Sequence, residues 1–207
     1  VVWKYPIVGA VPYKGFFVAA DAEAAGKKLA AKGYDTYLRP SGAFSTLGWF
    51  EDPLLSTALI RDSVELAALV FHEIAHNSLY VKSATPFNES FAQFAGYRAA
   101  ERFFRDRGDS AHAAQAADRW HDEMVLGAYY GALVDRATAF YGTKPDSAAL
   151  EAGRLELGRW VKAQLEGPVS DSLRTVQVAS PVPERPINNA RLVGVTIYRT
   201  KLPLFER

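Results

Sequence analysis

The sequence predicts an α+β fold: a small N-terminal mixed sheet packs on one long helix, and a mainly helical part follows. Three observations favour this class. Residues typical of strands and turns fill the first fifty positions, apolar residues recur at near-helical spacing over 61–80, and alanine-rich amphipathic segments occupy most of the rest. For 207 residues we expect one compact domain, with a strand-rich subdomain and the long helix over 1–84 and a mainly helical subdomain over 85–207.

The first fifty residues are predicted to form a strand, a helix, a strand and a further extended piece. Residues 8–18 are rich in aromatic and β-branched side chains and are punctuated by glycine and proline. Strong helix formers over 21–32 precede Gly33, which stands where a C-terminal cap belongs. Residues 34–39 alternate as in a strand, and 43–50 can form another short strand.

Two proline signatures then mark helix starts. Asp52-Pro53 and Thr85-Pro86 each place a side-chain acceptor at the N-cap and a proline at the first helical position. We expect a long, largely buried helix over 61–80. Another helix is expected to begin at the second signature.

The rest of the chain is predicted to be mainly helical. The helix that begins at residue 85 is expected to run to residue 105 and to end before Gly108-Asp109. Amphipathic helices follow over 111–141 and 147–166. Residues 167–188, with four prolines, are expected to form a long loop, and the pattern over 191–198 fits a strand or a helix equally.

The composition excludes several classes of function. The formal net charge is +1 and charges of both signs are interspersed, so no basic stripe favours nucleic acid. The absence of cysteine excludes disulfide frameworks, thiol nucleophiles and cysteine zinc sites. No apolar stretch approaches the ~18 residues that span a bilayer. Because the chain starts with neither a signal peptide nor a natural initiator, we expect a mature or trimmed form.

The residues with the strongest chemical signal are His72-Glu73-Ile74-Ala75-His76, within the long predicted helix. Histidines four residues apart project from one helix face, so both imidazoles can reach one ion at the ~2.0–2.1 Å that zinc requires. Glu73 can lean toward the same centre without binding the metal, where it can take a proton from water and deliver it to a leaving amine. The pattern predicts a zinc metallohydrolase of the peptidase type.

A second interpretation of this motif is that His72 and His76 are surface histidines and that Glu73 is a solvated glutamate between them. The flanking residues Leu69, Val70 and Phe71 are apolar, as expected for a buried helix. Polar side chains in such a helix are costly to bury unless a partner satisfies them. A bound cation would do so, and the metal interpretation is therefore favoured.

A catalytic zinc site needs a third protein ligand and an open fourth position. Glu89, between Asn88 and Ser90, is our candidate. On a helix continuous with His76 it would lie ~20 Å away. The chain must therefore reverse over 77–84 and place Glu89 in the opening turns of a second helix. The alternative role for Glu89 is a solvated carboxylate that stabilises the helix N-terminus.

His112 and His121 are the competing third ligands, but we expect both at surface or interhelical positions. The metzincin pattern would need a histidine at position 82, which holds Lys82. His121 is kept as a candidate for stabilising the transition-state oxyanion. A ligating histidine usually donates its other ring nitrogen to a carboxylate or carbonyl, and the amide oxygen of Gln93 could accept such a bond.

Several motifs, taken together, resemble the bacterial putative aminopeptidase family. The resemblance is dense from about residue 5 to 97, sparse through the helical middle, and returns near 185–204. The motifs are Tyr34-Asp35-Thr36-Tyr37, Ser45-Thr46-Leu47-Gly48-Trp49-Phe50, Asp52-Pro53-Leu54-Leu55, Phe71-His72-Glu73-Ile74-Ala75-His76, Leu79-Tyr80-Val81-Lys82, Phe87-Asn88-Glu89-Ser90-Phe91-Ala92 and Asn188-Asn189-Ala190-Arg191-Leu192.

The resemblance implies a zincin-like peptidase that binds one Zn²⁺ per chain through His72, His76 and Glu89, with Glu73 as the base. It also implies a peptide substrate and a setting in the bacterial cell envelope or periplasm, because relatives commonly carry an export or lipoprotein signal. A cytoplasmic location is left open. Relatives usually have more chain before the first residue, and they often carry two cysteines near the equivalents of Lys4 and Ala10 that are missing here.

The working hypothesis is an aminopeptidase, and two alternatives are kept. One is a zinc endopeptidase or amidase with a different cleft; the other is a non-catalytic zincin-fold protein that binds peptides or the cell wall. A substrate could lie as an added strand beside 42–48, and Glu51 and Asp52 are candidate anchors for its free amine.

The residue that stabilises the transition-state oxyanion is left open by the sequence. The candidates are Tyr80, Tyr129, Tyr198, Arg191 and His121.

Overall fold

A computed structural model describes residues 1–6, 9–40, 59 and 62–206 of the chain. The described part is mainly helical and carries one short hairpin. In chain order the elements are β1 (Trp3–Tyr5), β2 (Gly9–Val11), α1 (Ala19–Ala30), α2 (Ser63–Ser78), α3 (Thr85–Arg105), α4 (Ser110–Gly142), α5 (Ser147–Leu165), α6 (Pro168–Ser172), α7 (Asn189–Arg199) and a 3₁₀ turn (Leu202–Leu204).

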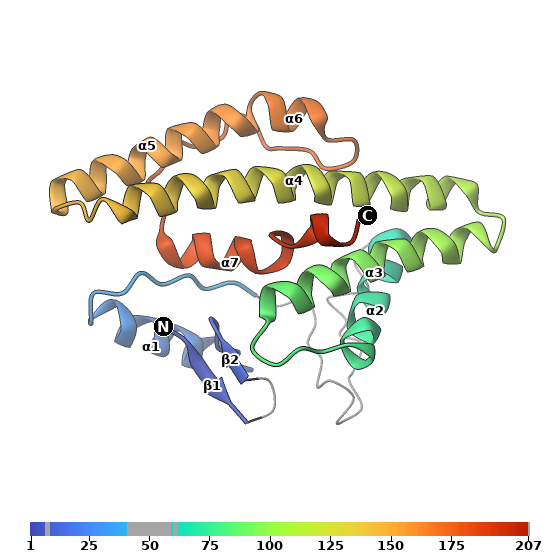
Figure 1. The fold of residues 1–207 in the computed structure, drawn as a ribbon, viewed down its shortest axis with the longest axis horizontal. Helices are drawn as coiled ribbons and strands as arrows, with labels where there is room; N and C mark the ends of the chain where they lie inside the picture. Colours follow the sequence, from blue (N-terminus) through green and yellow to red (C-terminus); the bar gives the residue numbers. More distant parts are fainter. Residues whose placement is uncertain (7–8, 41–58, 60–61, 207) are drawn as a thin grey trace.

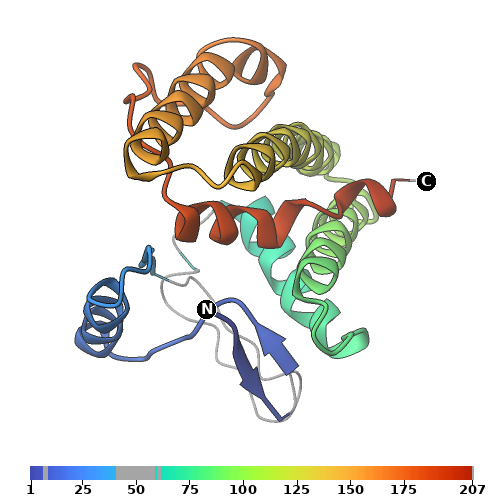
Figure 2. The same ribbon diagram turned by 60° about the vertical axis from the view of Figure 1, so that its left-hand side comes forward.

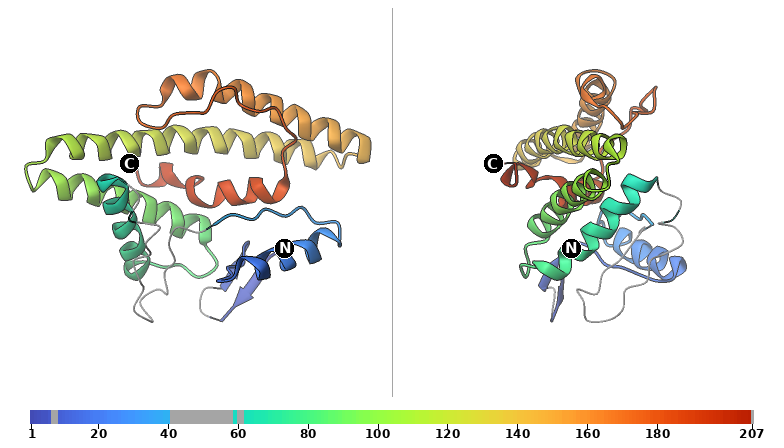
Figure 3. Two further views of the ribbon diagram at one scale, coloured as in Figure 1. Left: turned by 180° about the vertical axis from the view of Figure 1, so that it is seen from behind. Right: turned by 90° about the vertical axis from the view of Figure 1, so that its right-hand side faces the viewer.

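Helix α4 is the longest element and the others are arranged around it (Figure 1). Helices α5 and α6 lie along one side of α4, and α3 and α7 lie along the other (Figures 1 and 2). Helix α2 packs on α3, at the end of the molecule away from α5 (Figure 3). Within the described ranges, no helix is long and apolar enough to cross a membrane.

The described core is helical and has two parts. The first joins α2, α3, α4 and the C-terminal 3₁₀ turn; the second joins the C-terminal half of α4 to α5 and the approach to α7. Buried residues of the first part are Val64, Ala68, Tyr97, Ala100, Phe104, Ala113, Ala116, Trp120 and Leu202. Those of the second are Leu133, Ala137, Leu157 and Ile187. Helix α2 is thus fixed against α3 by apolar burial on the face of α2 that carries Val64 and Ala68.

The predicted mixed sheet is wrong for the described residues, where β1 and β2 form a two-stranded antiparallel hairpin in the register Trp3↔Val11 and Tyr5↔Gly9. The hairpin is tied to the connection after α2, because Ser83 Oγ accepts a hydrogen bond from Ala10 N at 3.1 Å. The α+β class is compatible with this arrangement, although its β part is very small.

The predicted strand over 34–39 is also wrong. Those residues carry no strand in the structure and run as an extended segment beside α7 (Figure 1). One of their carbonyl groups is bound by a side chain: Asn188 Nδ2 donates to Thr36 O at 3.1 Å. The expected strand over 43–50 and the helix start at Asp52-Pro53 lie outside the described residues.

The helical predictions are confirmed with small shifts. Helix α3 has the expected bounds, and Gly108, with a φ of 75°, ends the turn that follows it in the left-handed region that glycine tolerates. The ambiguous stretch over 191–198 is the helix α7, which Asn188 caps by accepting a hydrogen bond from Arg191 N at 3.0 Å. The long predicted loop contains the short helix α6.

A buried carboxylate fastens the loop after α6 to α4. Asp122 is 0% exposed and accepts hydrogen bonds from the backbone N–H groups of Arg174, Thr175 and Val176, each at 2.8 Å. Burial by itself would raise the pKa of Asp122, but these donors and the Thr175 hydroxyl outweigh it, so the pKa lies below its ordinary value.

Candidate metal centre

The two motif histidines lie on one face of α2, one turn apart. The helix begins after Asp62, whose side chain accepts a hydrogen bond from Glu65 N at 2.8 Å, and it ends at Ser78. The imidazole rings of His72 and His76 meet edge to face, with centroids 4.9 Å apart, and their Nε2 atoms are 3.2 Å apart. Both nitrogens therefore point to one place, as the four-residue spacing predicts.

A sharp reversal after α2 delivers Glu89. Asn88, 1% exposed, holds the reversal by a pair of hydrogen bonds to one residue: its Oδ1 accepts from Val81 N and its Nδ2 donates to Val81 O, both at 2.8 Å. The expected N-cap of α3 is shifted by one residue, because Ala84 is the N-cap and Thr85 is the first helical residue. Glu89 follows Asn88 directly, so the clamp on Val81 also places Glu89 in the first turns of α3.

His72, His76 and Glu89 form the one group of metal-type ligands found in the described residues, with donor atoms within 4.8 Å of one another. Glu89 Oε2 lies 3.5 Å from His72 Nε2 and 3.7 Å from His76 Nε2. Their side chains are between 9% and 12% exposed. Two imidazoles and a carboxylate thus converge where little water reaches them.

These separations fit a tetrahedral zinc ion. At bond lengths of ~2.0–2.2 Å, atoms at tetrahedral positions lie about 3.3–3.6 Å apart. The observed edges of 3.2, 3.5 and 3.7 Å lie within about 0.1 Å of that range, so one ion at such bond lengths could reach all three atoms. The three residues could supply three ligands to such an ion, which would leave one tetrahedral position for water or substrate.

The close approach of α2 and α3 depends on Gly96. A Cβ atom built on Gly96 would lie 2.6 Å from Ala68 O and 3.3 Å from His72 Cβ. The first distance is to backbone, which cannot swing aside as a side chain can. The glycine therefore sets how near Glu89 on α3 comes to the histidines on α2.

We expect Gly96→Ala to weaken metal binding more than it weakens folding. The added methyl pushes α2 away from α3 and lengthens the Glu89–His72 separation, while better helix propensity offsets part of the packing cost. Zinc affinity should fall roughly 10-fold or more, as measured by competition with a chromogenic chelator. Gly131→Ala on α4, where a Cβ meets nothing within 4 Å, is the matched control. Unchanged zinc affinity in Gly96→Ala would contradict this account.

Burial favours the metal-binding form of His76. Burial is the largest influence on the pKa of His76 and lowers it; Glu89 acts in the opposite direction and His72 adds to the lowering. The neutral imidazole is the form that ligates metal. Within the described part of the chain, His76 Nδ1 has no hydrogen-bond partner. The interaction expected from Gln93 is therefore not formed with this atom.

Comparison with known proteins assigns the family. A family model described as "Putative aminopeptidase" matches residues 1–207, the whole chain. The chain belongs to this family. No curated protein and no solved structure matched it.

In this member of the family, three tyrosines lie within electrostatic range of Glu89. Tyr13, Tyr80 and Tyr198 all have a raised pKa, for which burial is the largest cause and the Glu89 carboxylate the second. Glu73 also raises the pKa of Tyr198, so the carboxylates of Glu73 and Glu89 both act on that phenol. Two oxyanion candidates named from the sequence, Tyr80 and Tyr198, are therefore close enough to Glu89 for its charge to raise their pKa.

Tyr13 and Arg39 were missed by the sequence reasoning. Tyr13 follows β2, and Arg39 acts electrostatically on both Tyr13 and Tyr198. No local pattern marked either residue, since each comes to the centre from a segment without regular structure. A signal that could have found Arg39 is its place just after the motif Tyr34-Asp35-Thr36-Tyr37, whereas no motif lies near Tyr13.

The other oxyanion candidates have different surroundings. Tyr129 stacks on Trp160 with centroids 5.7 Å apart, and Arg191 is the cation that lowers its pKa against the effect of burial. His121 contacts Ser172 O at 3.1 Å, beside α6. Tyr129, Arg191 and His121 are not among the residues that shift the pKa of Tyr13, Tyr80 or Tyr198.

His112, which the sequence analysis did not favour as a metal ligand, lies at the start of α4, and an interhelical position was expected for it. Its Nδ1 lies 2.6 Å from Asp109 Oδ2, and its ring stacks on Phe104.

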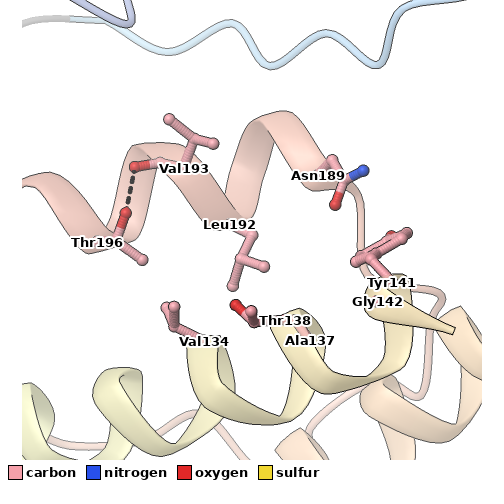
Figure 4. A pocket seen from close by; sticks show the side chains of 9 residues that line it. All are labelled: Val134, Ala137, Thr138, Tyr141, Gly142, Asn189, Leu192, Val193 and Thr196. Carbon is pink, nitrogen blue, oxygen red and sulfur yellow. Dashed lines mark hydrogen bonds between the residues drawn. The ribbon is translucent and has the colours of Figure 1, made fainter.

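A separate cavity of about 570 Å³ lies between the C-terminal half of α4 and α7 (Figure 4). Its wall is mostly apolar and includes Val134, Ala137, Leu192 and Val193. None of its lining residues is a histidine, aspartate or glutamate, so this cavity lacks the groups needed for metal-assisted chemistry. The ligand triad is a distinct feature on α2 and α3.

Proposed function

We propose that this chain is a zinc-dependent aminopeptidase that holds one Zn²⁺ through His72, His76 and Glu89. The family description supports a peptidase. The observation that carries the zinc proposal is the triangle of donor atoms with edges of 3.2, 3.5 and 3.7 Å, which matches tetrahedral zinc ligation.

The bound ion would supply Lewis acidity, which lowers the pKa of a coordinated water toward ~7 and polarises the scissile carbonyl. Glu73 follows His72 on α2, and its carboxylate, like that of Glu89, raises the pKa of Tyr198. Its carboxylate accepts the proton of the attacking water and delivers that proton to the leaving nitrogen. The Tyr198 hydroxyl is the donor proposed for the negative charge that develops on the carbonyl oxygen. The substrate strand expected beside 42–48 and the amine anchors Glu51 and Asp52 lie outside the described residues.

The first test is the zinc content of the purified protein, measured by mass spectrometry. We expect one zinc per chain in the wild type and a loss of affinity of more than ~100-fold in Glu89→Ala, because a direct ligand matters more than an outer-shell partner. Glu101→Ala is the matched control: the same helix loses a glutamate that pairs with Arg98 and Arg105 instead. Wild type without zinc after reconstitution would contradict the proposal.

Activity then separates the functional alternatives. An aminopeptidase cleaves amino-acid anilides and spares an N-blocked, internally quenched peptide, whereas an endopeptidase does the reverse. If zinc is bound and neither substrate nor a simple amide is cleaved, the chain is a peptide-binding or cell-wall-binding protein instead.

A further inference from the structure

An arginine from the N-terminal part of the chain binds the hydroxyl of Tyr198. Arg39 Nη2 donates a hydrogen bond to Tyr198 Oη at 2.9 Å, across 159 positions of sequence. The guanidinium carbon also lies 5.4 Å from the centre of the Tyr198 ring. The contact is thus double, to the oxygen and to the ring, and it fixes where the phenol oxygen lies.

The segment that carries Arg39 is laid along α7. At its start, Asp35 Oδ2 accepts a hydrogen bond from Asn189 N at 3.1 Å and pairs with Arg154 at 2.6 Å. Farther on, Tyr37 passes so close to Gly194 that a Cβ atom there would be 3.3 Å from its ring.

The extended segment 35–39 and the facing part of α7 span equal lengths. Four extended residues from Asp35 to Arg39 cover roughly 14 Å, and nine helical residues from Asn189 to Tyr198 cover about the same distance. Contacts at the start, the middle and the end of this stretch thus stay in register. An extended segment of this length brings Arg39 to Tyr198 without any strand pairing.

Helix α7 is itself held against α3 and α4. Arg199 makes a double hydrogen bond to Glu123 on α4, at 2.7 and 2.8 Å. Ser90, the neighbour of Glu89, donates to Tyr198 O at 3.3 Å and accepts from Lys201 N at 3.2 Å. The backbone of Tyr198 is therefore fixed relative to Glu89, and Arg39 fixes the far end of its side chain.

We propose that Arg39 is a positioning residue, whose guanidinium holds the Tyr198 hydroxyl so that its proton is donated to the oxyanion of the substrate. The proposal rests on the proposed peptidase function. A phenol oxygen has one proton. Because this oxygen accepts a hydrogen bond from Arg39, its own proton points away from Arg39. In the described residues the Tyr198 proton has no acceptor, so it is available to a substrate oxygen. A charged donor on the phenol oxygen also polarises the O–H bond and makes it a stronger donor.

The test is a double-mutant cycle on the zinc-loaded protein, with an amino-acid anilide as substrate. Tyr198→Phe should lower kcat about 100-fold. Arg39→Gln should lower kcat roughly 10-fold with KM within about 2-fold, and Arg39→Lys should fall between it and the wild type. In the Tyr198→Phe background, Arg39→Gln should change kcat by less than about 2-fold, because its effect passes through the missing hydroxyl.

Arg136→Gln is the matched control. Arg136 is also an exposed arginine over an aromatic ring, that of Trp160 at 4.9 Å, and it has no contact with the ligand residues. Its kcat should equal that of the wild type. The proposal would be overturned if Arg39→Gln lowered kcat equally in the wild-type and Tyr198→Phe backgrounds, or if it did not lower kcat at all. It would also be overturned if only KM rose, and that result would make Arg39 a substrate-binding residue.

A second readout does not depend on catalysis. In the zinc-free protein with ¹³C-labelled tyrosine, the NMR signal that disappears in Tyr198→Phe should shift in Arg39→Gln and stay in place in Arg136→Gln. An unchanged signal in Arg39→Gln would contradict the contact. If the wild type binds zinc and cleaves nothing, while this signal shifts as expected, the peptidase function fails and the Arg39–Tyr198 contact stands without its catalytic role.

Discussion

Glu73→Gln is expected to lower kcat by about 10²–10⁴-fold while one zinc per chain stays bound. Glutamine has nearly the shape of glutamate but cannot take up a proton. Glu73 lies between the two histidine ligands in sequence and outside the group of converging ligand atoms, so metal binding should survive its replacement. The measurement is a pair of values on the same sample: kcat on an amino-acid anilide and zinc content by mass spectrometry.

The control for this prediction is Glu151→Gln, the same change at an exposed glutamate on α5. It should leave both values unchanged. Loss of zinc from Glu73→Gln would assign Glu73 to metal binding, and full activity with zinc bound would contradict its role as the base.

Asp122→Asn is expected to cost about 2–4 kcal/mol of unfolding free energy at pH 7. The buried carboxylate accepts hydrogen bonds from three backbone N–H groups and from the Thr175 hydroxyl. In asparagine an NH₂ group replaces one of the two acceptor oxygens, and this group would face the N–H and O–H donors without an acceptor. Urea unfolding followed by circular dichroism gives the difference. Asp118→Asn is the control, since Asp118 pairs with Arg174 in the same loop but is 41% exposed, and it should cost less than about 1 kcal/mol.

The Asp122 effect should depend on pH in one direction. The pKa of Asp122 in the folded protein lies below its ordinary value, so the unfolded chain takes up a proton first as pH falls. The carboxylate's stabilisation is therefore complete above about pH 4 and is lost as pH falls through the folded pKa. The gap between wild type and Asp122→Asn should be widest near neutral pH and should narrow toward pH 3. A gap that widens in acid would contradict this assignment.

The local features of the candidate site follow from the sequence because neighbouring residues determine them. His72 and His76 share a helix face by their spacing alone, and apolar flanks indicate that the face is buried. Glu89 was named as third ligand because a reversal had to precede it, and the structure brings it within 3.5 Å of His72. Its use as a metal ligand stays a prediction until zinc is measured.

The errors concern contacts between distant segments. Residues 34–39 have the alternation of a strand, but a strand exists only where another strand supplies hydrogen-bond partners. Here no strand lies beside them among the described residues: the side chain of Asn188 binds the backbone of Thr36, and Arg154 pairs with the side chain of Asp35.

The sequence by itself determined helices α2 to α5 and the shared helix face of the two histidines, since helix periodicity and caps act over four residues or fewer. Only the tertiary structure decided how near α3 comes to α2, which Gly96 permits, and which phenol Arg39 binds. The bond from Arg39 to Tyr198 joins residues 159 positions apart. Such contacts depend on how the helices pack, and packing is a property of the whole chain.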